Sequence, residues 1–286
     1  MGINVLMIES VGVCNSTCSY CPQGAGLLPK AKNEEIFICP TVLEKALKLA
    51  KNGNQKAIYL HHRGEPLLHP NIGYVVREVR KAGFFAYLST NLISATDKKI
   101  DELLISGINQ IEMHMTAGLT KLNDGEVLKR IHTFRKRNWE LRNNGCKLEA
   151  NYALGPDDTE ESVRERLSKN SYYDENMYIR FYKPHDWPGL MKMQDLGVDP
   201  TKCEWYKTET CAILSNGDIV ICCLDQKKYS KKVNIMDINE ITFDHLSNRQ
   251  ICKGCIQQQW DMDWLKLEAL NIPDYISRRQ EIDTWK

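Results

Sequence analysis

The sequence lacks the features that would place it in a membrane, outside the cell or on a polyanion. Its 286 residues hold 38 basic and 37 acidic side chains, so the formal net charge is +1 and predicts no general attraction to nucleic acid. No uncharged apolar run approaches the roughly 18 residues that a transmembrane helix needs. Residues 1–13 have no basic segment, and Glu9 interrupts their apolar stretch, so they do not resemble a signal peptide. We therefore expect a soluble, cytoplasmic protein with neither a nucleic-acid nor a membrane partner.

The sequence also has no low-complexity tract and no obvious internal repeat. Strand-like and helix-like apolar patterns alternate instead. Strands are predicted at residues 3–8, 57–61, 84–89, 110–115, 148–154 and 178–182, and helices at residues 39–51, 71–82, 98–106, 125–138 and 160–169. Asp158 or Thr159 is the expected N-cap of the last helix. The alternation predicts an α/β fold of parallel βαβ units, arranged either as a doubly wound sheet or as a barrel.

The pattern changes after Trp187-Pro188-Gly189, where the alternation ends. Ser215-Asn216-Gly217-Asp218 predicts a short hairpin, because an Asn-Gly pair favours a tight turn between strands. Residues 260–286 are expected to be helical, with a break at Pro273.

Cysteine is the residue type that the chain does have in excess, with eleven copies. In a reducing compartment, many cysteines indicate metal or redox chemistry rather than disulfides. Cys14, Cys18 and Cys21 have the spacing CX3CX2C directly after the first predicted strand. Three such thiolates can bind three irons of a 4Fe-4S cluster and leave the fourth iron open to a small chelating molecule. A zinc site, which usually needs four ligands, and a reduced, inert loop are the alternatives.

These cysteines resemble the signature of the radical S-adenosylmethionine (SAM) superfamily, and further motifs follow in the same order along the chain. Arg63-Gly64-Glu65-Pro66 resembles the GGEP motif, in which the resemblance makes Gly64, Glu65 and Pro66 contacts of the SAM amino group. Ser89-Thr90-Asn91 resembles a TNG-like triplet near the SAM ribose, and Tyr20 would flank the adenine. Arg63 and Leu92 stand where the family has glycines.

The resemblance covers about residues 3–183 and implies the family's partial (β/α)6 TIM-like barrel, here assigned to residues 1–183. It also implies the family's chemistry. SAM chelates the open iron of the cluster, an electron cleaves it, and the resulting 5′-deoxyadenosyl radical takes a hydrogen atom from the substrate. Reduction would come from a donor such as flavodoxin or ferredoxin.

A second group of cysteines resembles the Twitch form of the SPASM extension, which we assign to residues 184–259 as a small β-hairpin and helix domain. The resemblance implies a second, auxiliary 4Fe-4S cluster whose four ligands are Cys203, Cys222, Cys252 and Cys255. Four protein thiolates saturate such a cluster, so electron transfer is its expected work. A structural zinc site with four cysteines fits the same spacing. Residues 260–286 form the expected helical tail.

The remaining cysteines have two expected roles. Cys223 neighbours Cys222 in a presumed strand, so its side chain would point to the opposite face, where it is a candidate hydrogen-atom donor or a small buried residue. Cys39, Cys146 and Cys211 are expected to be packing residues.

The reaction is suggested by a narrower resemblance, to radical SAM enzymes that act on aminoglycoside precursors, such as the aminocyclitol dehydrogenase of butirosin biosynthesis. Its basis is the one-cluster extension, the chain length and His114-Met115-Thr116-Ala117-Gly118 at the end of the fourth strand. The resemblance implies an oxidoreductase of natural product biosynthesis that dehydrogenates a carbinol carbon of a sugar or aminocyclitol, with the auxiliary cluster as electron acceptor. Candidate catalytic contacts lie at strand ends or just past the last strand: His114, Arg180, His185 and Asp186.

Three alternatives stay open. The first is epimerisation of a sugar, with hydrogen returned by Cys223. The second is modification of a ribosomal peptide, which an additional N-terminal peptide-binding domain would favour; we expect no such domain, because residues 1–8 lead straight into the first strand. The third is a zinc-binding interaction protein.

Overall fold

The computed structural model describes residues 3–28, 36–115, 122–184, 205, 209–225 and 232–246, with only the backbone of residues 243 and 244. Several predictions fall outside these residues. They concern Cys203, Cys252, Cys255, His185, Asp186 and the helical tail at 260–286. Among the described residues, no helix is both long and apolar enough to cross a membrane.

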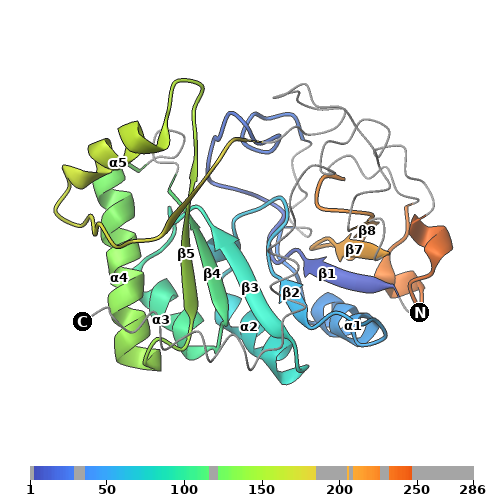
Figure 1. Cartoon of the computed structure of the whole chain (residues 1–286). Helices are drawn as coiled ribbons and strands as arrows, with labels where there is room; N and C mark the ends of the chain where they lie inside the picture. The colour runs from blue at the N-terminus through green and yellow to red at the C-terminus, as the bar shows by residue number, and fades with distance from the viewer. Residues whose placement is uncertain are drawn as a thin grey trace.

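One curved sheet runs through the described part of the molecule (Figure 1). Its strands, in the order β6-β5-β4-β3-β2-β1-β7-β8, are all parallel to their neighbours except β8, which is antiparallel to β7. The bounds are β1 Asn4–Ile8, β2 Ala57–Tyr59, β3 Phe85–Thr90, β4 Gln110–His114, β5 Lys147–Ala153, β6 Ile179–Tyr182, β7 Thr210–Ile213 and β8 Ile219–Val220. The first six strands with their crossover helices form the expected partial TIM-like barrel.

The helices α1 to α4 pack along one face of this sheet (Figure 1). Their bounds are α1 Pro40–Ala50, α2 Ile72–Lys81, α3 Asp97–Ile105, α4 Asp124–Arg142 and α5 Glu160–Ser168, with short 3-10 turns η2 Pro66–Leu68, η5 Ile235–Asp237 and η6 Phe243–Leu246. Helix α2 illustrates why they form: it buries Ile72, Val75, Val76 and Val79, and ends in basic residues that suit the carbonyl end of a helix.

Helix α4 differs in length from the sequence prediction, and the start of α5 decides between its two candidate N-caps. Helix α4 is longer than the predicted 125–138, because Asn123 and Glu126 form a capping box and the helix continues to Asn143, whose φ of 45° ends it in the left-handed region. Helix α5 begins after Thr159, which forms a capping box with Ser162. Asp158 accepts a hydrogen bond from the Gly155 N–H instead.

Side chains alternate between the two faces of the strands, so the sheet has two apolar layers. The larger layer lies between the sheet and the helices. We call the opposite side the inner face; its apolar layer contains Leu6, Tyr59, Tyr87, Ala212, Val220 and the buried Trp205.

The predicted hairpin at 215–218 is confirmed as the connection between β7 and β8. It continues the barrel's own sheet, because β7 pairs in parallel with β1 through partners such as Val5 and Cys211. The expectation that Cys222 and Cys223 alternate across a strand is wrong. Strand β8 ends at Val220, and the next residue, Ile221, donates its N–H to the Asp225 carboxylate at 3.4 Å, so both cysteines lie in a turn closed by the Asp225 N–H on the Cys222 carbonyl.

The three cysteines expected to be packing residues divide between the core and the surface. Cys146 and Cys211 are buried, as predicted. The prediction for Cys39 is wrong, since it is exposed. Cys39 precedes Pro40 as the N-cap residue of α1, a position at the helix end where its side chain faces solvent.

Candidate functional site

The three N-terminal cysteines lie together in the compact loop that follows β1 in the chain. They are thiols without disulfide bonds, and each is only partly exposed. The Ser16 N–H donates to Cys14 Sγ at 3.4 Å, and the Ser16 hydroxyl lies 3.0 Å from Cys18 Sγ. The Cys21 N–H donates to the Cys18 carbonyl at 3.1 Å, so the chain turns back on itself between the cysteines.

Two glycines allow this loop to pack closely. A Cβ on Gly24 would lie 2.5 Å from the backbone nitrogen of Cys18, and a Cβ on Gly64 would overlap the carbonyl oxygens of Val11 and Val13. Only glycine therefore lets the motif at 63–66 approach the segment between β1 and the cysteines. The sequence predicted Gly64 as a contact of SAM. It did not predict that Gly24 packs against the backbone of Cys18, and its being a glycine was the only signal available.

Glu65 is buried and accepts three hydrogen bonds. Its Oε1 atom accepts from the Thr90 hydroxyl at 2.7 Å and from the Leu67 N–H at 2.9 Å, and its Oε2 atom accepts from the Asn91 N–H at 2.8 Å. Burial raises the pKa of this carboxyl to about 6, although the three donors oppose the shift. A carboxylate has about four lone-pair sites, so one site on Oε2 is left for an ammonium donor.

Asn91 joins the end of β3 to the cysteine loop. Its Nδ2 donates to Asn15 Oδ1 at 2.9 Å and lies 3.5 Å from Cys14 Sγ. Leu92 follows with a φ of 64°, in the left-handed region that favours the glycine found there in the family. Its side chain is fully buried in the core, and Arg130 of α4 donates to the carbonyls of Leu92 and Ile93.

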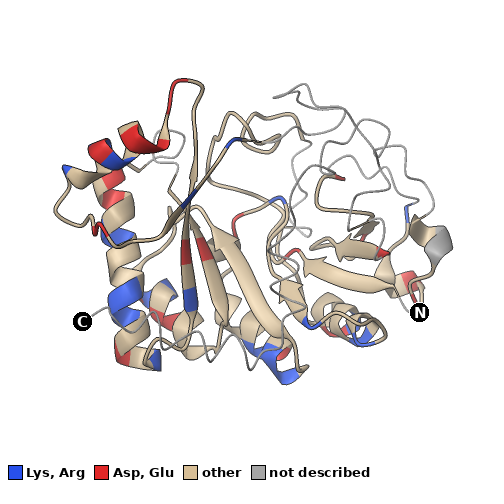
Figure 2. Ribbon diagram, in the orientation of Figure 1, with Lys and Arg blue, Asp and Glu red and all other residues tan. Residues whose placement is uncertain are grey.

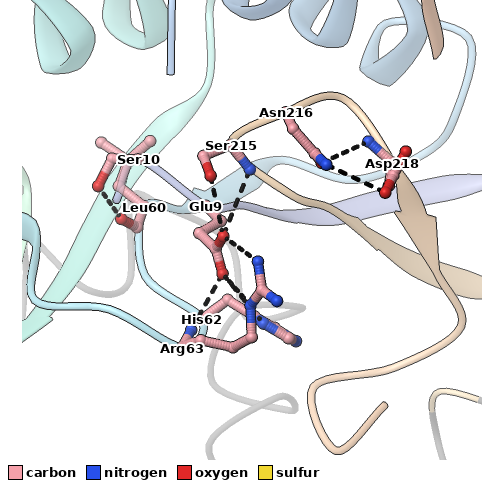
Figure 3. A network of polar contacts seen from close by, with 8 residues as sticks. All are labelled: Glu9, Ser10, Leu60, His62, Arg63, Ser215, Asn216 and Asp218. Atoms are coloured by element: carbon pink, nitrogen blue, oxygen red, sulfur yellow. Dashed lines mark hydrogen bonds and ion pairs between the residues drawn. The ribbon is translucent and has the colours of Figure 1, made fainter. Parts of the chain in front are cut away.

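Arg63, at the other glycine position of the family, belongs to a buried charge network (Figure 3). Its guanidinium donates twice to Glu9, with Nε 2.9 Å from Oε2 and Nη2 2.8 Å from Oε1, and its N–H donates to Oε2 at 3.2 Å. Ser215, in the turn after β7, donates its hydroxyl to Glu9 at 3.2 Å. Although burial opposes ionisation, Arg63 and His62 hold the pKa of Glu9 well below its usual range. Glu9 therefore joins the ends of β1, β2 and β7.

Polar side chains form rows across the inner face, because parallel strands in register present neighbouring residues on the same side. One row holds Ser89, Glu112 and Glu149, and the next, nearer the carboxyl ends, holds His114, Asn151 and Arg180. Figure 2 marks acidic residues on β4 and β5 in red on the ribbon. A barrel interior is usually filled by branched apolar residues, so these rows are unusual for a purely structural core.

The second row reaches the cysteine loop through Tyr182. Its hydroxyl lies 3.2 Å from His114 Nδ1, and a further hydrogen bond joins Tyr182 to Tyr20. On its other side His114 Nε2 lies 4.0 Å from Glu112 Oε2. The structure thus brings the predicted residues Tyr20, His114 and Arg180 to one region.

Two residues of this region were missed by the sequence analysis. Asn151 Oδ1 is buried and has no hydrogen-bond partner among the described residues. His61 follows β2, and its Nδ1 atom accepts the Ser89 N–H at 3.1 Å. Its position two residues after Tyr59, on the inner face, is the signal that was available.

The cysteine loop fits a 4Fe-4S cluster better than a free thiol site. Burial raises the pKa of Cys14 to about 11 and also raises that of Cys21, so thiolates at these two positions are favoured by a bound cation. Within the described ranges, no three or more His, Cys, Asp or Glu residues are placed to hold a single metal ion. Thiolates that bind different irons of a cluster need no such convergence.

The chain belongs to the radical SAM superfamily, whose family model matches residues 8–169. It is therefore a radical SAM enzyme, with a 4Fe-4S cluster and SAM implied as cofactors. It is 32% identical over 111 residues to the tungsten-containing aldehyde ferredoxin oxidoreductase cofactor-modifying protein of Pyrococcus furiosus, a match that covers 38% of this chain and 30% of that relative.

Solved structures with a similar fold share little sequence with the chain. BtrN in complex with AdoMet and 2-DOIA has 16% identity and a TM-score of 0.53, covering 94% of this chain and 87% of BtrN. Streptococcus suis SuiB bound to the precursor peptide SuiA has 13% identity and a TM-score of 0.60, covering 90% and 67%. The anSMEcpe complex with AdoMet and the Cp18Cys peptide has 14% identity and a TM-score of 0.57, covering 92% and 87%. At this identity the likeness concerns the fold alone.

Proposed function

We propose that this radical SAM enzyme dehydrogenates a carbinol carbon of a sugar or aminocyclitol to a ketone. Cys14, Cys18 and Cys21 would hold the SAM-binding cluster, and Cys203, Cys222, Cys252 and Cys255 an auxiliary 4Fe-4S cluster. When bound, these groups supply a 5′-deoxyadenosyl radical that takes a hydrogen atom from carbon, and an acceptor for the remaining electron. Flavodoxin or ferredoxin is the proposed reductant.

The observation that carries the proposal is the row of His114, Asn151 and Arg180, in which Asn151 Oδ1 has no hydrogen-bond partner in the described part of the chain. An unsatisfied buried acceptor costs about 1–3 kcal/mol, and a ligand that donates a hydrogen bond to Asn151 Oδ1 would remove this cost. A hydroxyl donates one hydrogen bond and accepts others. The row therefore suits a polyol, with Asn151 accepting from a hydroxyl and Arg180 donating to an oxygen.

His114 is the proposed base for the hydroxyl proton. The proton would move to Nε2, where the Glu112 carboxylate at 4.0 Å stabilises the imidazolium that forms. Tyr182 holds the ring through Nδ1. For SAM, the free lone pair of Glu65 Oε2 would accept from the ammonium, Gly64 and Pro66 would shape the loop, and Tyr20, Ser89 and Asn91 would flank the nucleoside.

The proposal is tested by incubating anaerobically reconstituted protein with SAM, dithionite and 2-DOIA, followed by other cyclitols and aminocyclitols. We expect 5′-deoxyadenosine and a ketone that an oxime reagent traps. His114→Ala and Arg180→Ala should lower ketone formation about 100-fold or more. His132→Ala and Arg77→Ala change exposed residues of the same types and should match wild type. No ketone from any cyclitol, or full activity of His114→Ala, would contradict the proposal.

Epimerisation is the second candidate, because Cys223 is partly buried and packs against both apolar layers, including the one on the inner face. An epimerase would place deuterium from heavy water at the reacting carbon, whereas a dehydrogenase would not. Cys223→Ala should leave dehydrogenation intact but block epimerisation after hydrogen abstraction.

SuiB and anSMEcpe are described with peptides, so a peptide substrate is the competing class. Turnover of peptides but of no cyclitol would favour it.

A further inference from the structure

His61 lies on the inner face among the polar rows, at the end of β2. Its ring centroid is 5.8 Å from that of Tyr59 and 5.4 Å from that of Tyr87, both inner-face residues. It also interacts electrostatically with His114, the proposed base. The residue retains some exposed surface, as a group that meets a ligand must.

The backbone of β3 determines the tautomer of His61. Its Nδ1 atom accepts the N–H of Ser89 at 3.1 Å, so this nitrogen carries a lone pair and the proton lies on Nε2. One position earlier, the Leu60 N–H donates an ordinary backbone hydrogen bond to the Tyr87 carbonyl of β3. The Ser89 N–H is a backbone donor of the same strand, but its acceptor is the His61 side chain. A rigid backbone donor therefore fixes which nitrogen faces away from the sheet.

The surroundings of His61 keep it uncharged. Burial, followed by the neighbouring His114 and His62, lowers its pKa to about 3. The groups around it include Tyr59 of β2, Tyr87 and Ser89 of β3, and the two histidines. Glu112, a carboxylate of the row on β4, accepts a hydrogen bond from the Tyr87 hydroxyl. His61 is therefore a neutral N–H donor across the physiological pH range.

We infer that His61 is a specificity-determining residue whose Nε2–H donates a hydrogen bond to an oxygen of the substrate. The inference rests on the proposed function, and it adds a rule for which substrate group can lie beside His61. An oxygen accepts from Nε2–H, whereas an ammonium group at the same point would set donor against donor and leave both unpaired. The substrate position beside His61 is thus a hydroxyl or carbonyl, and any amino group of an aminocyclitol lies elsewhere.

The first test is NMR spectroscopy of the reconstituted protein with 15N-labelled histidine. Long-range 1H–15N spectra should show His61, assigned with His61→Gln, as the neutral Nε2–H tautomer from about pH 5 to about pH 9. Saturating 2-DOIA should shift the His61 Nε2–H resonance. An Nδ1–H tautomer, an imidazolium, or no shift with 2-DOIA would overturn the inference.

The second test separates binding from chemistry in the kinetics. His61→Leu should raise the KM for 2-DOIA about tenfold with kcat within a few-fold. His61→Gln should restore the KM, because its amide can accept from Ser89 and still donate. His132→Leu is the matched control. An unchanged KM in His61→Leu, or a glutamine variant no better than leucine, would overturn the inference.

The two tests distinguish His61 from the proposed function. Binding of 2-DOIA with a shifted His61 resonance but without any ketone would remove the proposed dehydrogenation and retain the His61 contact. Ketone formation with normal kinetics in His61→Leu would retain the proposed dehydrogenation and remove the His61 contact.

Discussion

Leu92 combines an unfavourable backbone conformation with a favourable, fully buried side chain. Its φ of 64° costs about 1–2 kcal/mol for a residue with a Cβ, whereas its fully buried side chain contributes a favourable packing energy. The side chain fills the core under α4, and the backbone turn aims Asn91 at the cysteine loop. Leucine is tolerated at a glycine position because burial outweighs the strain.

This balance predicts an inverted order of stability for two variants. Leu92→Ala and Leu92→Gly both remove the packing and should destabilise the fold by about 2–5 kcal/mol, but the glycine variant should be about 1 kcal/mol more stable than the alanine variant. At Leu103, which is equally buried inside α3, alanine should be the more stable by about the same amount. Urea unfolding of the four variants measures both differences. Equal stabilities of the two Leu92 variants would contradict the argument.

At the scale of elements, the Glu9 network holds three strand ends together. The folded-state pKa of Glu9 is depressed, so its stabilisation is fully present above the pKa of the unfolded chain, near 4.3, and is lost as the pH falls toward the folded value. Glu9→Gln should lower the free energy of unfolding by about 3–5 kcal/mol at pH 7, since Arg63 then lacks its counter-charge.

The difference between wild type and Glu9→Gln should be constant from about pH 8 to about pH 5 and shrink below about pH 4, as urea unfolding at each pH would show. Glu140→Gln is the control, because Glu140 pairs with Arg137 on the exposed face of α4 and should contribute about 0.5 kcal/mol or less. A cost for Glu9→Gln as small as that of the control would mean that the network does not stabilise the strand ends.

The β7–β8 hairpin depends on Gly217 in two ways. Its φ of +87° is strained for any other residue, and a Cβ there would lie 2.8 Å from Asn234 Oδ1. Asn234 itself donates to the Asn216 carbonyl at 2.8 Å, so a displaced Asn234 loosens the turn that precedes Cys222.

Gly217→Ala should therefore destabilise the protein by more than Gly83→Ala. Gly83 also has a positive φ, of +94°, but open space around the added Cβ, so its cost should be about 1 kcal/mol from strain alone. Thermal unfolding compares the two variants. Iron content should also fall in Gly217→Ala and not in Gly83→Ala, if the hairpin holds the proposed auxiliary cluster. Equal melting temperatures would argue against the clash.

For the whole molecule, the number of clusters is the central expectation. Anaerobically reconstituted protein should contain about eight irons and eight sulfides per chain, and a Cys14/Cys18/Cys21→Ala triple variant about four of each, because each 4Fe-4S cluster needs its own cysteines. A count of about four that falls to none, with zinc present, would assign the second site to zinc. No iron in wild type would contradict both cluster sites.

Much of the barrel could be predicted because its signals are local. Apolar periodicity within each segment predicted all six barrel strands and five helices to within a few residues. The CX3CX2C spacing placed three cysteines in one loop, and their role as cluster ligands stays a prediction. Prediction was wrong at two cysteines, where the local backbone differs from the one that the pattern predicts. Cys223 lies in a turn after the end of β8 at Val220, and Cys39 is exposed at the N-cap of α1.

The sequence by itself determined the order of strands and helices, the cysteine loop and the radical SAM motifs, since each depends on residues close together in the chain. The tertiary structure alone decided which side chains meet. Ser89 reaches His61 across 28 residues, Arg63 reaches Glu9 across 54, and Ser215 reaches Glu9 across 206. The tautomer of His61, the charge of Glu9 and the lack of a partner for Asn151 Oδ1 among the described residues arise from strand register and burial, which exist only once the sheet has formed.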